Sequence, residues 1–198
     1  MKIESISSGR VKPLLVRDGK ELRQVVSGIN KSPISTLQNP ISIEINRLGI
    51  IGDEQADLTV HGGVEKAVYV YPVEHYAFWK TILEQEKRPN NLMQHGFFGE
   101  NLTISGINEK EVFVGDQWKI GNTRFSVVKL REPCYKFNAK MGFSSASKLM
   151  LQNAYSGWYL RVLEQGSIKA GDLISVTAGR QEISIHQQNL NLLRLNIR

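Results

Sequence analysis

The chain contains a single cysteine, Cys134, among 198 residues, so it cannot form an internal disulfide. Small secreted domains typically depend on several disulfides, and this scarcity argues against that class and favours a reducing compartment. A chain of this length buries enough apolar surface to fold without disulfides or a structural metal. We therefore expect one main globular domain in the cytoplasm.

Long apolar runs are also missing. No stretch approaches the roughly 20 apolar residues that a membrane-spanning helix requires. The first twenty residues alternate apolar and polar side chains, unlike a signal peptide. We expect no membrane segment and no membrane partner.

The charge is basic but dispersed. The chain has 25 Lys and Arg against 19 Asp and Glu, a net charge of +6, and no block of consecutive basic residues. An excess of positive charge suits an anionic partner, whereas nucleic-acid-binding tails usually carry runs of Lys and Arg. We therefore expect no nucleic-acid partner. A phosphate-bearing small molecule and a plainly solvated basic surface both remain open.

Several familiar site signatures are absent as well. The sequence has no GxxxxGK[ST] loop and no GxGxxG turn opening a helix. Its histidines are His61, His75, His95 and His186. They show no HExxH spacing, and the sequence has no CxxC pair that could bind zinc with them.

What the sequence does contain is many short alternating runs bounded by Gly, Asp and Asn, which predict strands. The expected strands are 2–7, 41–46, 66–71, 111–114, 117–120, 124–129, 156–162 and 173–176. This spacing is typical of a barrel or folded sheet, so the fold class is mainly β with helices. Helices are expected over 72–87 and 145–153, and a short amphipathic one at the chain end, with Leu190, Leu193 and Ile197 on one side. We divide the chain into a barrel domain, 1–178, and a C-terminal tail, 179–198.

A first candidate binding loop is GDEQADLTVHGG, which begins at Gly52 and is followed by Lys66. Adjacent glycines, Gly62 and Gly63, let backbone N–H groups approach an anion closely, and Lys66 adds a point charge. An elaborate turn explains the same residues equally well.

A second candidate is FFGENLT, in which Glu100 and Asn101 follow Gly99. The Asn101 amide is suited to hydrogen-bond a ring or phosphate oxygen. Both side chains are equally suited to form hydrogen bonds with backbone groups of their own turn.

The third candidate is LREPCYKFN, which carries Cys134 between Arg131 and Lys136. Neighbouring cations favour the thiolate, which is both the nucleophile and the metal ligand. Pro133 stiffens the approach to the thiol. A lone cysteine is nevertheless more often an inert core residue.

These segments, in this order, resemble MOSC-domain proteins, in which MOSC denotes the molybdenum-cofactor sulfurase C-terminal domain. The resemblance rests on GDEQADLTVHGGVEKAVYVY, FGENLTISG, VGDQWKIGNTRFSVVKLREPCYKFN and GWYLRVLEQGSIKAGD, and runs from about Gly49 to Gly171. It is strongest for the short, stand-alone bacterial branch of the family. It implies a compact mixed β-barrel of the pyruvate-kinase-barrel type, decorated by helices.

The resemblance also implies a molybdopterin-type molybdenum cofactor, and pyridoxal phosphate as a ligand associated with the family. It implies that Cys134 is the thiolate ligand to molybdenum, a soft sulfur donor to the metal. The expected cofactor-binding residues are Gly62, Gly63, Lys66, Asn101, Arg131 and Lys136, and the expected catalytic residues are Cys134 with His61 or Asp57 as proton donor.

Two departures from the family pattern stand out. Leu130 occupies a position where related sequences often have proline, and only about twenty residues follow Ala178, where this branch tends to carry three helices.

The leading hypothesis from the sequence is therefore an oxidoreductase that reduces N-hydroxylated small molecules, such as hydroxylaminopurine-type base analogues. Its electrons are expected from a separate flavin or iron–sulfur reductase, because the chain has neither a cysteine cluster nor a dinucleotide fingerprint. Sulfur transfer through a Cys134 persulfide, a non-catalytic cofactor carrier and a nucleic-acid-binding barrel remain as alternatives.

Overall fold

The computed structural model describes residues 1–18, 21–57, 62–89 and 93–195. Its strands are β1 (Lys2–Ser8), β2 (Lys12–Asp18), β3 (Glu21–Ser27), β4 (Ser32–Thr36), β5 (Ile43–Asn46), β6 (Gly49–Ile50), β7 (Val68–Pro72), β8 (Leu102–Ser105), β9 (Gln117–Ile120), β10 (Thr123–Leu130), β11 (Trp158–Glu164), β12 (Gly166–Ile168) and β13 (Ile174–Thr177). Its helices are α1 (Tyr76–Gln85), α2 (Tyr135–Met141), α3 (Ala146–Gln152) and α4 (Ile185–Leu195), with one-turn 3-10 helices η1 (Val64–Lys66) and η2 (Val73–His75).

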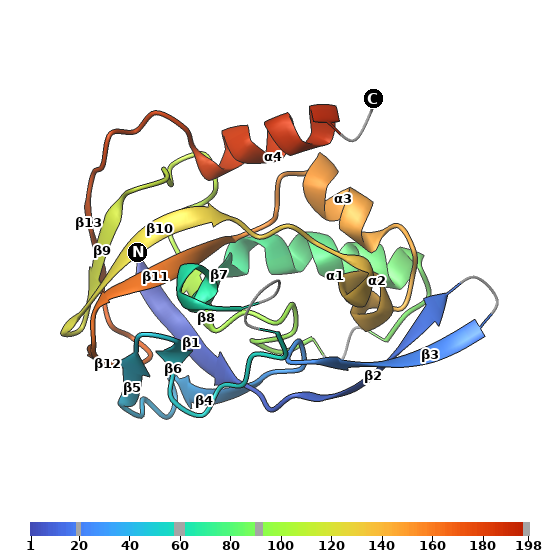
Figure 1. Cartoon of the computed structure of the whole chain (residues 1–198), viewed down its shortest axis with the longest axis horizontal. Helices are drawn as coiled ribbons and strands as arrows, with labels where there is room; N and C mark the ends of the chain where they lie inside the picture. The colour runs from blue at the N-terminus through green and yellow to red at the C-terminus, as the bar shows by residue number, and fades with distance from the viewer. Residues whose placement is uncertain (19–20, 58–61, 90–92, 196–198) are drawn as a thin grey trace.

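The main sheet has eight strands in the order β13-β9-β10-β11-β7-β8-β1-β4, with β7 and β8 parallel and the other pairs antiparallel. It curls so that its two sides meet. Ile3 N donates to Asp172 O (3.0 Å) and Gly171 N donates to Ile3 O (2.8 Å). The result is a half-barrel closed near the N-terminus (Figure 1). The predicted mainly-β, barrel-like fold with a C-terminal helix is confirmed.

The barrel interior follows from the alternation seen in the sequence. In β9, Trp118 and Ile120 are buried while Gln117 and Lys119 are exposed, because successive side chains of a strand point to opposite faces. The Trp118 ring packs edge-on against Trp158 of β11, with ring centroids 5.6 Å apart. Burial of such large side chains supplies much of the stability of the barrel.

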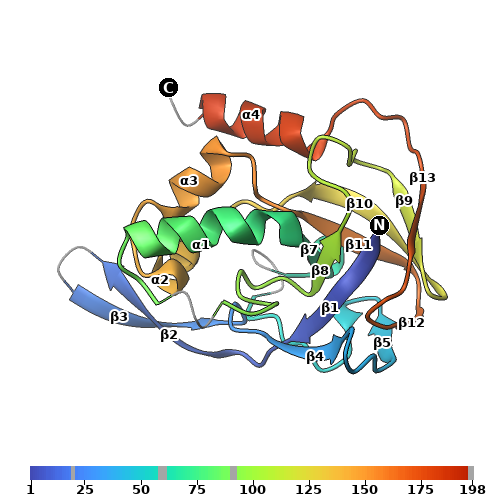
Figure 2. The same cartoon turned by 180° about the vertical axis from the view of Figure 1, so that it is seen from behind.

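A second apolar cluster joins α1, α2 and α3 beside the sheet. Trp79 of α1 packs against Phe98 and Phe137, with ring centroids 5.8 and 5.7 Å away. Met141 and Met150 complete the contact between α2 and α3. Figures 1 and 2 show these helices grouped on one side of the sheet, at the end where β10 leads into α2.

A two-stranded ribbon, β2–β3, projects from the body beside α2 (Figures 1 and 2). It pairs from Lys12 opposite Ser27 to Asp18 opposite Glu21. This ribbon was not among the predicted strands.

Several predicted elements are corrected by the structure. The predicted strand over 111–114 is a turn with a single bridge, Phe113 to Ser184, because no neighbouring strand continues the pairing. The helix predicted over 72–87 starts as η2 and becomes α-helical only over Tyr76–Gln85. The strand predicted over 66–71 begins at Val68, after η1. Helix α2, which directly follows Cys134, was not predicted.

The tail forms α4, which packs on α3 and β10. The helix begins at Ile185, and its buried side chains are Ile185 and Asn189 rather than the predicted Leu190 and Leu193, which are only partly buried. Ile197 lies outside the described residues. The division at residue 178 stays a prediction. In the described part of the chain, no helix has both the length and the apolar character needed to cross a membrane.

Candidate functional site

The candidate site is a pocket of about 110 Å³ where the end of β10, the residues after β3 and the loop after β6 meet. It brings together residues far apart in the chain. The described residues that line it are Ser27, Gly28, Ile29, Lys31, Asp53, Glu54, Gln55, Ala56, Lys66, Tyr69, Phe98, Gly99, Asn101, Arg131, Cys134, Lys136 and Tyr159. Five of the predicted site residues, Lys66, Asn101, Arg131, Cys134 and Lys136, are therefore neighbours.

Cys134 sits at the junction between β10 and α2. It is the residue immediately before α2, has extended backbone angles and is half-buried. Its carbonyl oxygen accepts hydrogen bonds from Phe137 N (2.8 Å) and Ser147 Oγ (3.0 Å). These bonds hold the cysteine backbone against both α2 and α3, on the pocket wall.

Arg131 is the most distinctive charge at the site. Its side chain is only 6 % exposed, and its guanidinium lies over the rings of Phe137 (4.7 Å) and Tyr69 (5.6 Å). Nη1 contacts Met150 Sδ at 3.4 Å, and no ion pair joins Arg131 to a carboxylate in the described ranges. A buried charge without a counterion is costly, and the aromatic faces offset this cost only in part. Arg131 is therefore suited to bind an anion that enters the pocket.

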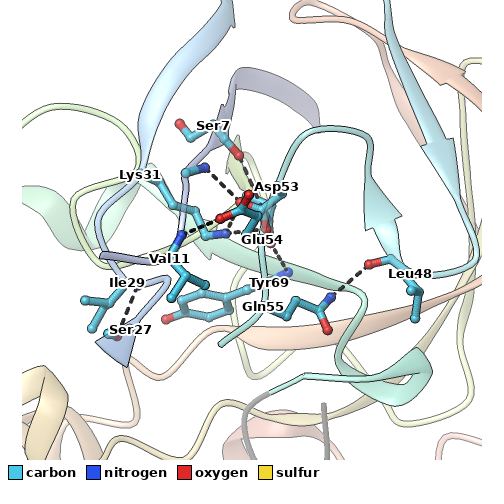
Figure 3. A network of polar contacts seen from close by, with 12 residues as sticks. Ser7, Val11, Ser27, Ile29, Lys31, Leu48, Asp53, Glu54, Gln55 and Tyr69 are labelled. Atoms are coloured by element: carbon cyan, nitrogen blue, oxygen red, sulfur yellow. Dashed lines mark hydrogen bonds and ion pairs between the residues drawn. The ribbon is translucent and has the colours of Figure 1, made fainter. Parts of the chain in front are cut away.

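A buried ion pair between Lys31 and Asp53 forms another part of the wall (Figure 3). The two side chains are 7 % and 6 % exposed. Burial lowers the pKa of Lys31, and the nearby charge of Asp53 opposes that effect. Asp53 also accepts from Gly9 N at 2.8 Å. The pair is internally neutral, so it shapes the pocket without adding net charge to it.

Asn101 joins three segments in the pocket wall. Its Oδ1 accepts from Tyr69 N (3.0 Å), and its Nδ2 donates to Asp53 Oδ2 (2.9 Å) and to Ser7 O (3.3 Å). Both amide N–H groups are thus engaged by the protein. The geometry gives Asn101 a positioning function for Asp53 and β7, and its binding to a cofactor stays a prediction.

Glu100 satisfies its own turn, one of the two readings left open by the sequence. It is fully buried and accepts from Gly96 N (2.7 Å), Phe98 N (3.0 Å) and Thr103 Oγ1 (3.0 Å), and from the hydroxyl of Tyr76. Burial raises the pKa of Glu100, and these hydrogen bonds oppose the shift. The carboxylate organises the turn and does not line the pocket.

Lys66 and Lys136 add two cationic side chains to the pocket wall. Lys66 comes from η1, at the end of the Gly-Gly loop. Lys136 comes from the first turn of α2, and its Nζ donates to Val26 O at 3.1 Å, which joins α2 to the base of the ribbon. Together with Arg131 they make the wall of the pocket positive.

The two glycines of the predicted binding loop lie outside the lining of the pocket. Gly63 has φ 86° and ψ 177°, a conformation essentially restricted to glycine. Its N–H donates to Gln55 Oε1 at 2.6 Å, so the protein itself uses this donor. Gly62, Gly63 and Asp57 are not among the lining residues, and His61 lies outside the described residues.

Sequence reasoning missed Lys31, Asp53, Tyr69 and Tyr159. Burial raises the pKa of Tyr159, and the charge of Arg131 opposes it. No local spacing marks these residues, because they reach the pocket from separate strands and loops. Only Asp53 lies within a segment that the sequence had singled out, the loop that begins at Gly52.

The C-terminal helix also reaches the site. Gln188 Oε1 accepts from Leu130 N at 2.8 Å, and Asn189 Nδ2 donates to Ser156 Oγ at 2.9 Å. Arg131 N in turn donates to Gly157 O at 3.2 Å. Helix α4 therefore contacts both the end of β10 and the segment just before β11. The hydrogen bond between these two segments fixes the backbone of Arg131.

Comparisons with known proteins agree with this geometry. The sequence profile of the MOSC domain matches residues 57–175. The uncharacterized protein YflK of Bacillus subtilis is 37 % identical over 173 residues, which are 87 % of this chain and 72 % of YflK. The crystal structure of YiiM from Geobacillus stearothermophilus superposes with a TM-score of 0.70 at 27 % identity, and covers all of this chain and 86 % of that one.

A third relative is much longer than this chain. A Gibberella moniliformis protein named "Reductase" is 34 % identical over 164 residues, which are 82 % of this chain but only 28 % of the fungal protein. In that relative, the matching segment is joined to a large additional polypeptide.

Proposed function

This chain belongs to the MOSC domain family, a family associated with the molybdenum cofactor, and from that premise we propose that its pocket holds this cofactor and that it works as an oxidoreductase. The observation that carries the proposal is Arg131, a buried guanidinium without a carboxylate partner in the described part of the chain, on the same pocket wall as the half-buried Cys134. A phosphate on the cofactor would supply the missing anion, and the thiolate would supply a soft ligand for the metal.

The residues present fit such a group. Arg131, Lys66 and Lys136 would hold the phosphate, and Cys134 would hold the metal. The described pocket, about 110 Å³, is smaller than the roughly 300–1,000 Å³ usual for a drug-sized ligand. The enclosed part would therefore take the anionic or metal-bearing end of the cofactor, and the remainder would extend towards the open side. When bound, the cofactor would supply a metal that exchanges two electrons with the substrate.

The proposed substrates are N-hydroxylated small molecules such as hydroxylaminopurine-type base analogues. Their reduction breaks the N–O bond, consumes two electrons and two protons, and yields the amine and water. The electrons would come from a separate flavin or iron–sulfur reductase. The fungal relative named "Reductase" supports the assignment as an oxidoreductase, because the segment that matches this chain is part of a longer protein with that name.

The test is metal analysis of protein expressed in cells that make the cofactor, with Cys134→Ser alongside. We expect about one molybdenum per wild-type chain, and a loss in the Cys134→Ser variant at least as large as the roughly 10–100-fold caused by outer-shell changes at metal sites. Reduction of 6-hydroxylaminopurine with reduced methyl viologen as donor should fall in parallel.

Equal molybdenum in the two proteins would show that Cys134 is not the ligand. A persulfide on Cys134 in metal-free protein would favour sulfur transfer instead. Stoichiometric molybdenum without turnover on any N-hydroxylated compound would reduce the assignment to a cofactor carrier.

A further inference from the structure

The β2–β3 ribbon presents one apolar face to solvent. Its register pairs Pro13 with Val26, Leu15 with Gln24, and Arg17 with Leu22, so these six side chains share a face. Leu15, Leu22 and Val26 are 63 %, 66 % and 56 % exposed. We call these six residues the outer face of the ribbon. A group of exposed aliphatic side chains on one face marks an interaction site more often than single exposed apolar residues do.

The opposite face of the ribbon is already used. Val16 is 3 % exposed and Ser27 is 5 % exposed, and β2 packs against α2. A slip of one residue would bring the outer face inwards, but the buried Val16 and the full register oppose it. The outer face is therefore a fixed surface and not a misplaced core.

This surface adjoins the candidate site. The chain that leaves β3 supplies Ser27, Gly28 and Ile29 to the pocket wall. Lys136, another wall residue, donates to Val26 O at 3.1 Å. Tyr135, the residue after Cys134, is 48 % exposed. A protein seated on the ribbon would consequently lie next to the mouth of the pocket.

The charges next to this surface indicate the character of its partner. Arg17 lies on the outer face itself, Lys136 of α2 reaches the backbone of Val26 at the base of the ribbon, and the whole chain carries a net charge of +6. A second copy of the chain, placed by two-fold symmetry, would bring these same cations together. An acidic partner would instead pair with them, and such complementarity speeds transient association.

We propose that the outer face of the β2–β3 ribbon is the docking surface for the electron donor, an acidic flavin- or iron–sulfur-bearing protein. The inference rests on the proposed function, which requires two electrons from outside the chain. Small interfaces are usual for redox encounters. The ribbon would seat the donor beside the pocket without occupying the pocket itself.

The test compares two electron sources on the molybdenum-loaded full chain. One is reduced methyl viologen, which needs no docking surface. The other is NADPH with a soluble extract of the organism from which the protein comes, which contains the natural donor. The double variant Leu15→Glu/Leu22→Glu should lose about tenfold or more of the extract-driven rate through charge repulsion, and keep the viologen-driven rate within about twofold.

Two further double variants separate the effect of the added charge from the effect of losing the apolar side chains. Leu15→Lys/Leu22→Lys removes the same apolar groups but keeps the sign of the surface, so its extract-driven rate should fall less than that of the Glu pair. Leu173→Glu/Leu195→Glu changes two leucines that are 73 % and 69 % exposed elsewhere, and it should behave as wild type. Raising the ionic strength should slow extract-driven turnover of wild type most.

Equal extract-driven rates for the ribbon and control variants would overturn the proposal, as would wild type that takes no electrons from the extract. A Glu pair that turns a dimer into a monomer, measured by light scattering, would assign the face to self-association and likewise reject it. Failure of viologen-driven turnover in every protein would instead count against the proposed function.

Discussion

Gln188, in the C-terminal helix α4, accepts a hydrogen bond from the backbone N–H of Leu130, 2.8 Å away. Leu130 is the last residue of β10, and Arg131 follows it into the pocket wall. The bond links the tail to the residue that precedes the buried Arg131. The helix that the structure describes in the tail therefore contacts the strand that leads into the site.

Replacing Gln188 should therefore alter the site more than the fold. Gln188→Ala leaves the Leu130 N–H without its partner, which should cost about 1–3 kcal/mol of stability. It should also weaken the protection of Cys134 by inorganic phosphate against alkylation by iodoacetamide. Gln188→Glu keeps an acceptor and should preserve that protection. Gln187, exposed on the same helix, provides the control as Gln187→Ala, and equal protection in all four proteins would show that the bond does not position the site.

Arg131 should show opposite effects on binding and on stability. Arg131→Met removes a buried charge that has no carboxylate partner in the described ranges and replaces it with an apolar side chain of similar length. A buried charge without an ionic partner is costly, so its removal should not lower the midpoint of thermal unfolding. Phosphate protection of Cys134 should drop about tenfold, since one charge-assisted contact is lost.

Arg131→Lys is the matched control, because it keeps the charge but loses the planar fork that packs on Phe137. We expect partial protection. A marked loss of stability in Arg131→Met with unchanged protection would mean that Arg131 is a structural residue.

The Lys31–Asp53 pair should be strongly coupled. Lys31→Met leaves the Asp53 carboxylate buried without its cation, which should cost about 3–5 kcal/mol in the free energy of unfolding. The double variant Lys31→Met/Asp53→Asn should recover part of that loss, as measured by urea unfolding in a double-mutant cycle. The exposed pair Arg10–Glu54 is the comparison, and its coupling should be far smaller. Additive effects at Lys31 and Asp53 would contradict the buried pair.

Glu100 should make stability depend on pH. Because burial raises the pKa of Glu100 in the folded state, the folded protein holds this proton at pH values where the unfolded chain, with a pKa near 4.5, has lost it. The contribution of Glu100 to stability is thus fully present below pH 4.5 and is lost as the pH rises through the folded pKa. Glu100→Gln cannot titrate.

Thermal unfolding of both proteins from pH 4 to pH 8 provides the measurement. The stability of wild type relative to Glu100→Gln should decline as the pH increases across this range. A relative stability that increases with pH would mean that the four hydrogen-bond donors outweigh burial and lower the pKa instead.

Some of the site was predictable because its residues lie next to each other in the chain. Arg131, Cys134 and Lys136 form one short segment, and their cationic character can be read without a structure. Asn101 and Lys66, which were predicted to bind the cofactor, lie on the pocket wall. The sequence did not reveal that the Asn101 amide is engaged by Ser7, Tyr69 and Asp53. Lys31 gave no signal, since a lysine is normally exposed and only its partner Asp53 makes its burial possible.

By itself, the sequence determined the mainly-β class, the alternating strands of the barrel and the segment that carries the only thiol. These features are local, because strand alternation and residue type do not depend on the rest of the chain. The tertiary structure decided which cations surround that thiol, that Arg131 is buried without a carboxylate beside it in the described residues, and that Gln188 reaches Leu130. It also decided which face of the β2–β3 ribbon remains in solvent. Burial and pairing across such distances arise only when the sheet curls and the helices close against it, so no single stretch of sequence encodes them.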